Sequence, residues 1–329
     1  MNIAIIGAGI AGLSCARYLK NLGVDLHIFE KSRNCSGRMS TRHHMQWSVD
    51  HGAQYFTARD PIFLKEVEEW MSNHVAAPWV PRLKIFDGKQ WLNSHSTDTR
   101  FVGTPNMTAP GEYLAKNLNI NFNQTINNVE HKNGNWIIYS QETGKIKKYF
   151  DFLIVAIPAA QAQILINNFN GDNVKSVISK FSNSAGMKGC WTLMLKPISS
   201  LDIEMDAAFI NNEIISWVCR NNSKPMRQNI ETWIVHANPK WSQEFINVDK
   251  NLAANLILQN ANKIGFNFSG AEYSVHRWRY ASGYLLSTPK FHISFKQKIA
   301  FCGDWLHGGR VEGAWLSGRT LAQKIASHF

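Results

Sequence analysis

The feature that most constrains the fold is a glycine-rich turn placed directly after a short apolar run. Residues 2–6 read Asn-Ile-Ala-Ile-Ile, which is typical of a buried parallel strand. Gly7, Gly9 and Gly12 follow at G-x-G-x-x-G spacing, and the next residues predict a helix that Gly23 closes. The first glycine permits a tight turn, the second lets the backbone approach a pyrophosphate, and the third lets helix and strand pack closely. We therefore expect a dinucleotide-binding strand–turn–helix unit.

An acidic residue stands where such a unit needs one. Residues 25–29 predict a second strand, which leads into Glu30. A carboxylate there can accept hydrogen bonds from a ribose diol. The helix that starts around Ala11 offers unpaired N–H groups and a partial positive charge to the phosphates. Together these features predict a nucleotide site.

The last part of the chain repeats this order of elements. Residues 298–302 predict a short buried strand, which leads into Gly303 and Asp304. A loop rich in glycine follows, and residues 313–318 begin a helix that continues through Ile325. The simplest geometry brings both glycine loops to one ligand, although a glycine-rich cap at the end of the fold is the alternative. We expect the second loop to be the other side of the nucleotide site.

Composition excludes several classes of protein. The 329 residues are 44% hydrophobic and 18% charged, as in soluble globular proteins, and suit two intermixed domains. No apolar run approaches the ~20 residues of a membrane span. The glycines interrupt the apolar N-terminal stretch, whereas a signal peptide needs a continuous apolar run, so we do not expect one here. The net charge of +11 is scattered, which favours a general solubility effect or a field around an anionic ligand over nucleic-acid binding. The five cysteines are far apart, so we expect neither disulfides nor a metal site, and a reducing cytoplasm.

The middle of the chain predicts a second kind of sheet. Alternating residues at 191–195, 214–219 and 231–236 are typical of antiparallel strands, and residues 250–264 predict a helix. This region contains no further glycine loop. The sequence thus predicts an α/β protein: a Rossmann-like domain with a parallel sheet, and an α+β substrate domain with a mainly antiparallel sheet.

Four residues of that second region are candidates for contact with a substrate. His236 closes an apolar strand, where a satisfied core histidine is the alternative. Arg220 begins a basic turn, which is either an exposed loop or a partner for phosphates or a carboxamide. A period of two puts Trp278 and Tyr280 on one face, as an aromatic wall or as core packing.

Two further motifs carry a resemblance. After Glu30, the segment Lys31 to Met39 ends in Gly37-Arg38-Met39 and resembles the extended FAD signature of the amine-oxidase-like flavoproteins. Ser36 stands where that family usually has a glycine. The run Asp-His-Gly-Ala-Gln-Tyr-Phe-Thr at residues 50–57 then resembles the renalase-like branch of the superfamily.

The resemblance implies a non-covalent FAD held by one discontinuous domain made of three segments. It assigns residues 1–75, 104–167 and 290–329 to FAD binding, and residues 76–103 and 168–289 to the substrate domain. It implies that Asp304 binds the ribityl or phosphate end and that the helix after it points its N-terminus at the flavin's pyrimidine edge. The cofactor-binding residues it implies are Gly7, Gly9, Ala11, Gly12, Glu30, Lys31, Gly37, Arg38, Met39, Gln54, Tyr55, Val129, Gly303, Asp304, Glu312, Gly313 and Ala314.

The same resemblance implies an activity. Bacterial renalase-like oxidoreductases oxidise misformed dihydronicotinamide isomers of NADH or NADPH and pass the electrons to oxygen, giving hydrogen peroxide. The implied partners are a small dinucleotide and O2, without nucleic acid, membrane or metal. His236 and Arg220 would orient the substrate, and Trp278 and Tyr280 would form the pocket wall. The alternatives are an amine oxidase, a non-catalytic flavin-binding regulatory protein and a plain NAD(P)-binding module.

Overall fold

The computed structural model describes residues 1–167, 169, 171–285 and 289–328. Its first large sheet has six strands in the order β19-β20-β13-β1-β2-β9, and all neighbours are parallel except β19 and β20. The strands are β1 (Asn2–Ile6), β2 (Asp25–Phe29), β9 (Ile120–Asn121), β13 (Phe152–Val155), β19 (His292–Ser294) and β20 (Ile299–Phe301). The first and last predicted strands therefore lie in one sheet, separated by β13.

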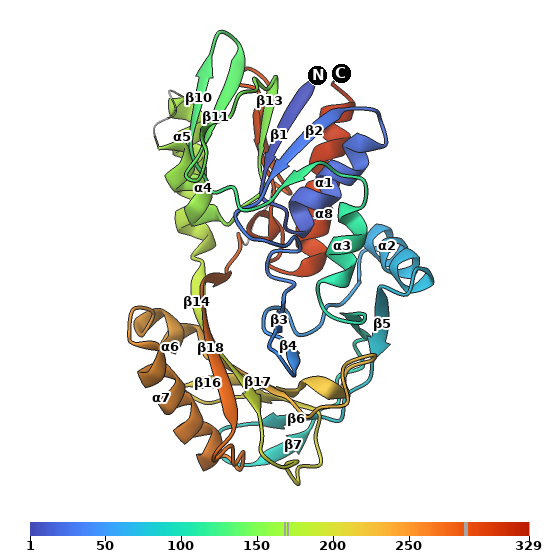
Figure 1. Cartoon of the computed structure of the whole chain (residues 1–329), viewed down its shortest axis with the longest axis vertical. Helices are drawn as coiled ribbons and strands as arrows, with labels where there is room; N and C mark the ends of the chain where they lie inside the picture. Colours follow the sequence, from blue (N-terminus) through green and yellow to red (C-terminus); the bar gives the residue numbers. More distant parts are fainter. Residues whose placement is uncertain (168, 170, 286–288, 329) are drawn as a thin grey trace.

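Both faces of the six-stranded sheet are covered, as Figure 1 shows. Ile3 and Ile5 pack toward the helices on one face, and Ala4 and Ile6 pack toward the other face. This explains why β1 is apolar at consecutive positions. The helices of the first face are α1 (Ile10–Lys20), α2 (Pro61–Ser72), α3 (Ala109–Ala115) and α8 (Val311–Ala326). The opposite face carries β10 (Ile126–Lys132), β11 (Asn135–Ser140) and β12 (Gly144–Lys145), with α4 (Ala159–Ile166) and α5 (Asp172–Ala185) beside them.

The second large sheet has seven strands in the order β18-β14-β17-β16-β15-β6-β7. Only β6 and β15 are parallel neighbours, so the sheet is mainly antiparallel. The strands are β6 (Leu83–Phe86), β7 (Trp91–Asn93), β14 (Lys188–Lys196), β15 (Ala207–Ile210), β16 (Ile215–Arg220), β17 (Trp233–Ala237) and β18 (Glu272–Ser282).

The two faces of the seven-stranded sheet have different neighbours (Figure 1). One face packs against α6 (Pro239–Glu244) and α7 (Lys250–Lys263). The other face packs against the hairpin of β3 (Thr41–His43) and β4 (Ser48–Asp50), which projects from the side of the six-stranded sheet. A smaller pair, β5 (Ala76–Trp79) and β8 (Arg100–Gly103), completes the connection, and short 3-10 turns follow β16 at Asn221–Ser223 and β20 at Asp304–Leu306.

The predicted fold class is confirmed, with local differences. Helix α3 begins at Ala109, and residues 120–121 pair with β2 as a short strand separate from β10, which begins at Ile126. The helices α4 and α5 had no counterpart in the prediction. The domain boundaries stay a prediction, and residues 168, 170, 286–288 and 329 of those ranges lie outside the described residues.

Candidate functional site

The first glycine turn has the geometry that its spacing predicts. Gly7 has φ +104°, and a Cβ there would lie 2.5 Å from the carbonyl oxygen of Ala156. A Cβ on Gly12 would overlap the carbonyl oxygen of Gly7. Beside a Cβ on Gly9, in contrast, the nearest atom is Cα of Gly37, at 4.0 Å. Packing therefore fixes the first and third glycines, and the second leaves room for a ligand.

The start of α1 suits a phosphate group. Gly9 is its N-cap and contributes no side chain to the first turn, where Ala11 and Gly12 are buried. The N–H groups of that turn carry the positive end of the helix dipole. The turn therefore fits the pyrophosphate of a dinucleotide.

Glu30 is fixed beside the same turn. Its carboxylate accepts hydrogen bonds from the backbone N–H groups of Ala8 and Ser32, both at 2.8 Å. The residue is buried, whereas the neighbouring Lys31 is exposed. An oriented acid at this position can accept hydrogen bonds from a ribose, and Lys31 is left at the rim.

The segment around Gly37 closes over the glycine turn. The N–H of Ser36 donates to the carbonyl of Ala8 at 2.9 Å, and a Cβ on Gly37 would lie 3.1 Å from Cα of Gly9. Met39 is buried in the adjoining core. The backbones at Gly37 and Gly9 therefore lie close together, and the buried side chain of Met39 holds the segment in place.

Arg38 joins three distant parts of the chain. Its guanidinium donates two hydrogen bonds to the carboxylate of Asp304, in the turn after β20. It also donates to the carbonyl of Ala281, near the end of β18, at 2.9 Å. The loop after β2, the loop after β20 and the seven-stranded sheet therefore meet at one guanidinium. Asp304 is buried, and this charge-assisted pair orients both side chains.

The second glycine loop is anchored through α8. The Glu312 carboxylate accepts hydrogen bonds from the backbone N–H groups of Arg59 and Asp60, at 2.6 and 2.7 Å. A Cβ on Gly313 would overlap the carbonyl oxygen of His307, so the loop folds tightly onto the helix start. The Glu312 carboxylate therefore caps the start of α2, and the cofactor contacts predicted for Glu312, Gly313 and Ala314 stay predictions.

Helix α8 also lies directly against α1. A Cβ on Gly318 would overlap the carbonyl oxygen of Ala11, and the Ser14 hydroxyl donates to the carbonyl of Trp315 at 2.9 Å. Gly303 has extended backbone, and its N–H donates to the Ser317 hydroxyl oxygen at 2.9 Å. The two helices that follow the two glycine loops are thus held in register.

A buried ionic cluster joins β4 to the turn after β16. The Asp50 carboxylate accepts hydrogen bonds from Lys224 at 3.1 Å and from Arg227 at 2.7 Å, and all three side chains are almost fully buried. Burial raises the pKa of Asp50, but the two cations more than reverse this and hold it well below its usual range. The site prediction missed Lys224, because lysine is ordinarily a surface residue.

Gln54 and Tyr55 have structural partners. The Gln54 amide donates to the carbonyl of Asp50 at 2.6 Å, and its oxygen accepts from Lys224 at 3.1 Å. The Tyr55 ring lies against Trp217, at 5.7 Å between centroids. Both residues shape the segment after β4, and their predicted contact with the cofactor stays a prediction.

Three histidines come together beside this segment. His236 on β17 and His276 on β18 are both opposite Thr192 of β14, so they share the face that meets the β3–β4 hairpin. The His51 ring stacks on Trp278 at 5.1 Å and meets His276 edge to face at 5.0 Å. Trp278 donates to the carbonyl of His51 at 3.0 Å. The predicted site residues include His236 and Trp278, but not His51 or His276.

The imidazoles of this cluster are neutral near pH 7. Burial and the nearby His276 and Arg42 lower the pKa of His51 from 6.5 to about 3. Burial lowers the pKa values of His236 and His276 to about 4, with smaller contributions from neighbouring cations. His51 Nδ1 and His236 Nε2 are buried and have no protein partner among the described residues. Such a pair suits hydrogen bonds with an uncharged polar group.

Arg220 lies on the other face of the seven-stranded sheet. It is opposite Trp233 and stacks on that indole at 4.9 Å, and it donates to the carbonyl of Ile203 at 2.8 Å. Trp217 and Cys219 face the opposite side of the sheet from Arg220, because side chains alternate along a strand. The structure therefore does not bring Arg220 to His236. The orienting role predicted for Arg220 has no support here. Tyr280 is half-buried and shares the parity of Trp278 on β18.

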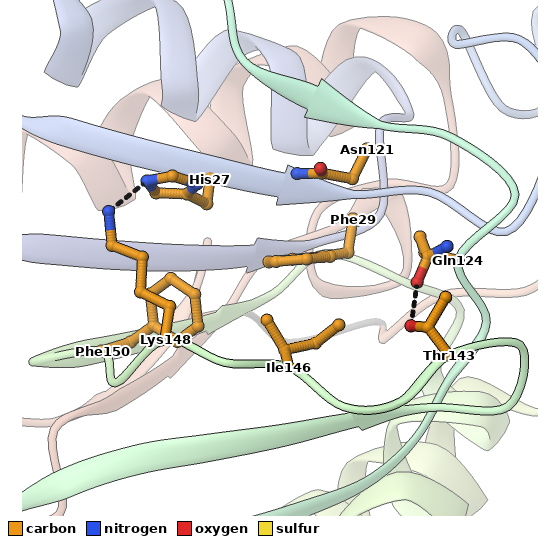
Figure 2. A pocket seen from close by; sticks show the side chains of 8 residues that line it. All are labelled: His27, Phe29, Asn121, Gln124, Thr143, Ile146, Lys148 and Phe150. Carbon is orange, nitrogen blue, oxygen red and sulfur yellow. Dashed lines mark hydrogen bonds between the residues drawn. The ribbon is translucent and has the colours of Figure 1, made fainter.

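Val129 and a separate cavity lie on the far side of the six-stranded sheet. The Val129 side chain is buried in the core beneath β10 and β11, and its predicted contact with adenine stays a prediction. A cavity of about 290 Å³ lies on this side, between β2 and the segment around Ile146. Figure 2 shows the side chains that line it. Its lining residues are His27, Phe29, Asn121, Gln124, Thr143, Ile146, Lys148 and Phe150. The sheet separates this cavity from α1 and α8, so it is not part of the site described above.

Ser36 replaces glycine without loss of the local geometry. It has φ +78°, a conformation that favours glycine, and its hydroxyl donates to the carbonyl of Thr108 at 2.8 Å above Gly111. The backbone strain costs about 1 kcal/mol, and the hydrogen bond contributes about 1 kcal/mol of stabilisation.

We expect Ser36→Gly to change the free energy of unfolding and the FAD dissociation constant little, within about 1 kcal/mol. Ser36→Ala keeps the strain and loses the bond, so it should lose about 1–3 kcal/mol in urea unfolding. Equal effects of the two substitutions would contradict this.

Within the ranges that the structure describes, no helix is long and apolar enough to cross a bilayer. The same ranges contain no group of three His, Cys, Asp or Glu side chains arranged to hold a metal ion, and the three histidines above do not form one.

Comparison with protein families gives two matches along the chain. Residues 5–67 match the NAD(P)-binding Rossmann-like domain, and residues 72–326 match the flavin containing amine oxidoreductases. The second match covers most of the chain and includes Asp304 and α8, whereas the first glycine turn, Glu30 and Arg38 lie in the first match. A short region is also similar to the lysine-specific histone demethylase 1B homolog of Caenorhabditis elegans, with 52% identity over 64 residues. That similarity covers 19% of this chain and 8% of that protein's length.

Solved structures share the whole fold. A putative protoporphyrinogen oxidase from Exiguobacterium sp. 255-15 superposes with a TM-score of 0.79 at 11% identity, covering 100% of this chain and 99% of that one. A putrescine oxidase bound to putrescine superposes with a TM-score of 0.74 at 11% identity, covering 99% of both chains. At this identity the likeness concerns the fold alone.

Proposed function

The chain belongs to the family of flavin containing amine oxidoreductases, and on that premise we propose that it oxidises dihydronicotinamide isomers, 2- or 6-dihydro-NAD(P). FAD is its cofactor, and the proposed binding set is the first turn of α1, Glu30, the Gly37–Arg38 segment and the first turn of α8. The partners of this proposal are a small dinucleotide and O2, in the cytoplasm.

The observation that carries the proposal is the charge around the histidine cluster. Arg42 contacts His276, and Lys224 and Arg227 together flank the carboxylate of Asp50, the residue before His51. A surplus of positive charge attracts the phosphates of a dinucleotide and opposes an ammonium ion. The stacked pair of Trp278 and His51 offers a flat wall for a ring.

The chemistry asks little acid–base work of the protein. FAD, when bound, accepts two electrons and later passes them to O2. A dihydropyridine ring that loses a hydride becomes an aromatic pyridinium, so no strong base is needed. Oxygen then takes two electrons and two protons and leaves as hydrogen peroxide. The protein's task is to orient the ring and exclude water, and neutral His236 and His51 can hold it without giving up a proton.

Anaerobic titration tests the proposal. The purified flavoprotein should lose its flavin absorbance with one equivalent of 2- or 6-dihydro-NAD(P), and air should restore it with one equivalent of peroxide. His236→Ala should lower the rate of reduction about 10-fold or more while the protein keeps its FAD. No reduction by either isomer would overturn the proposal.

The family match favours one other activity, the oxidation of an amine. Trp278 and Tyr280 would then line the path of a neutral amine. Anaerobic bleaching by putrescine or another simple amine, but not by the dihydronicotinamides, would support this alternative. Failure of both reductants would leave a flavin-binding protein without either activity.

A further inference from the structure

The protonation pattern of His236 can be worked out from its contacts. The ring hydrogen-bonds the backbone of His51, a contact that raises its pKa and so involves a donating ring N–H. The His51 backbone N–H already donates to Ser40 at 3.0 Å, so the partner of the ring is the His51 carbonyl. Nε2 of His236 is the nitrogen without a partner, and Nδ1 therefore makes this bond. A neutral imidazole has one N–H, so Nε2 is a bare acceptor.

From this geometry we infer that His236 Nε2 accepts a hydrogen bond from the N–H of a ring carboxamide and selects a carboxamide over a carboxylate. The inference rests on the proposed function and deepens it. It assigns the substrate class as nicotinamide dinucleotides, against their nicotinic acid counterparts. His51 Nδ1, also buried and unpaired among the described residues, is the second polar atom available to the same group.

The groups around the cluster keep this acceptor unprotonated. On β18, His276 Nδ1 faces the guanidinium of Arg42 at 3.3 Å. Lys224, from the turn after β16, is near enough to disfavour a proton on His236. The one acid of the set, Asp50, is held by Lys224 and Arg227. Added protons on the cluster are therefore opposed by Arg42 from the hairpin and by Lys224 from the turn after β16.

The chemical distinction follows from donors and acceptors. A carboxamide has two N–H donors and one carbonyl acceptor, whereas a carboxylate has acceptors only. Against a bare buried nitrogen, the carboxylate leaves two acceptors facing each other and both unpaired. An unmade buried hydrogen bond costs about 1–3 kcal/mol, which corresponds to roughly 5- to 150-fold in affinity or kcat/KM.

Binding and reduction are measured with matched dinucleotides. Holoenzyme is titrated with NAD+ and with nicotinic acid adenine dinucleotide, with the shift of the flavin absorbance as the readout. The 2- and 6-dihydro forms of both then serve as anaerobic reductants. We expect a preference for the carboxamide of about 10-fold or more in both measurements. His236→Leu should abolish the preference, and His236→Gln, whose side-chain oxygen accepts, should restore part of it.

His131→Leu is the matched control. His131 also has a buried Nε2 without a protein partner, but it lies on β10, on the far side of the six-stranded sheet. This variant should keep the wild-type preference. Equal use of both dinucleotides by the wild type, or an unchanged preference in His236→Leu, would overturn the inference and leave the oxidase proposal standing. Failure of every dihydro form to reduce the flavin would overturn the oxidase proposal itself.

Discussion

Replacing Asp50 by asparagine is expected to destabilise the protein by about 3–5 kcal/mol. The substitution leaves the ammonium of Lys224 and the guanidinium of Arg227 buried without a counter-charge. It also weakens the acceptor of two further bonds, from the Thr41 hydroxyl at 2.7 Å and the Met107 N–H at 3.1 Å. Urea unfolding of the holoprotein at pH 7 measures the loss.

Two variants make this expectation specific. Asp98→Asn removes the partner of Arg59 in a pair whose side chains are about half exposed, and should cost at most about 1 kcal/mol. Adding Lys224→Met to Asp50→Asn removes one of the stranded cations and should recover part of the loss. A loss no greater than that of Asp98→Asn would show that the cluster tolerates an unpaired charge.

Replacing Gly318 by alanine should separate α1 from α8 and weaken FAD binding by about 10-fold or more. The new methyl group overlaps the carbonyl oxygen of Ala11, a backbone atom that cannot move as a flexible side chain does. Overpacking of this kind costs about 1–3 kcal/mol. Intrinsic helix propensity acts in the opposite direction, since alanine is favoured over glycine by about 1 kcal/mol. A net loss would therefore come from the contact between the helices.

The FAD content after purification and the dissociation constant of the reconstituted apoprotein measure this effect. Gln323→Ala, on the exposed face of the same helix, is the control and should retain full FAD. If Gly318→Ala also retains full FAD with unchanged affinity, the close approach of α1 and α8 does not support the cofactor site.

The sequence predicted those parts of the site whose geometry is local. Gly7, Gly9 and Gly12 lie within one turn, and Glu30 follows at the end of the adjacent strand, so spacing alone places them. The pairing of Arg38 with Asp304 is not local and was not predicted, because the resemblance named the two residues only as separate contacts of the cofactor. The contact of Arg38 with the seven-stranded sheet, through the carbonyl of Ala281, was not predicted either.

The orientation of Arg220 was not predictable, because the sequence marks this residue only as the start of a basic turn. In the structure Arg220 ends β16, and regular alternation from Trp217 places its side chain on the face that carries Trp233. The ionic cluster is a second limit, because two cations and an acid from segments more than 170 positions apart in the sequence become buried only when the hairpin meets the other sheet.

The pairing of Arg38 with Asp304 has a consequence for assembly. Strand β20 reaches β1 only through β13, and α8 packs on α1, so contacts on the cofactor's two sides join residues some 300 positions apart. Loop closure over such separations is slow. A chain still lacking β20 and α8 would leave Ala11 and Ser14 uncovered and the guanidinium of Arg38 without its acid. We therefore expect FAD to enter a fold that is already nearly complete, so that refolding of the apoprotein limits the rate at which coloured protein appears.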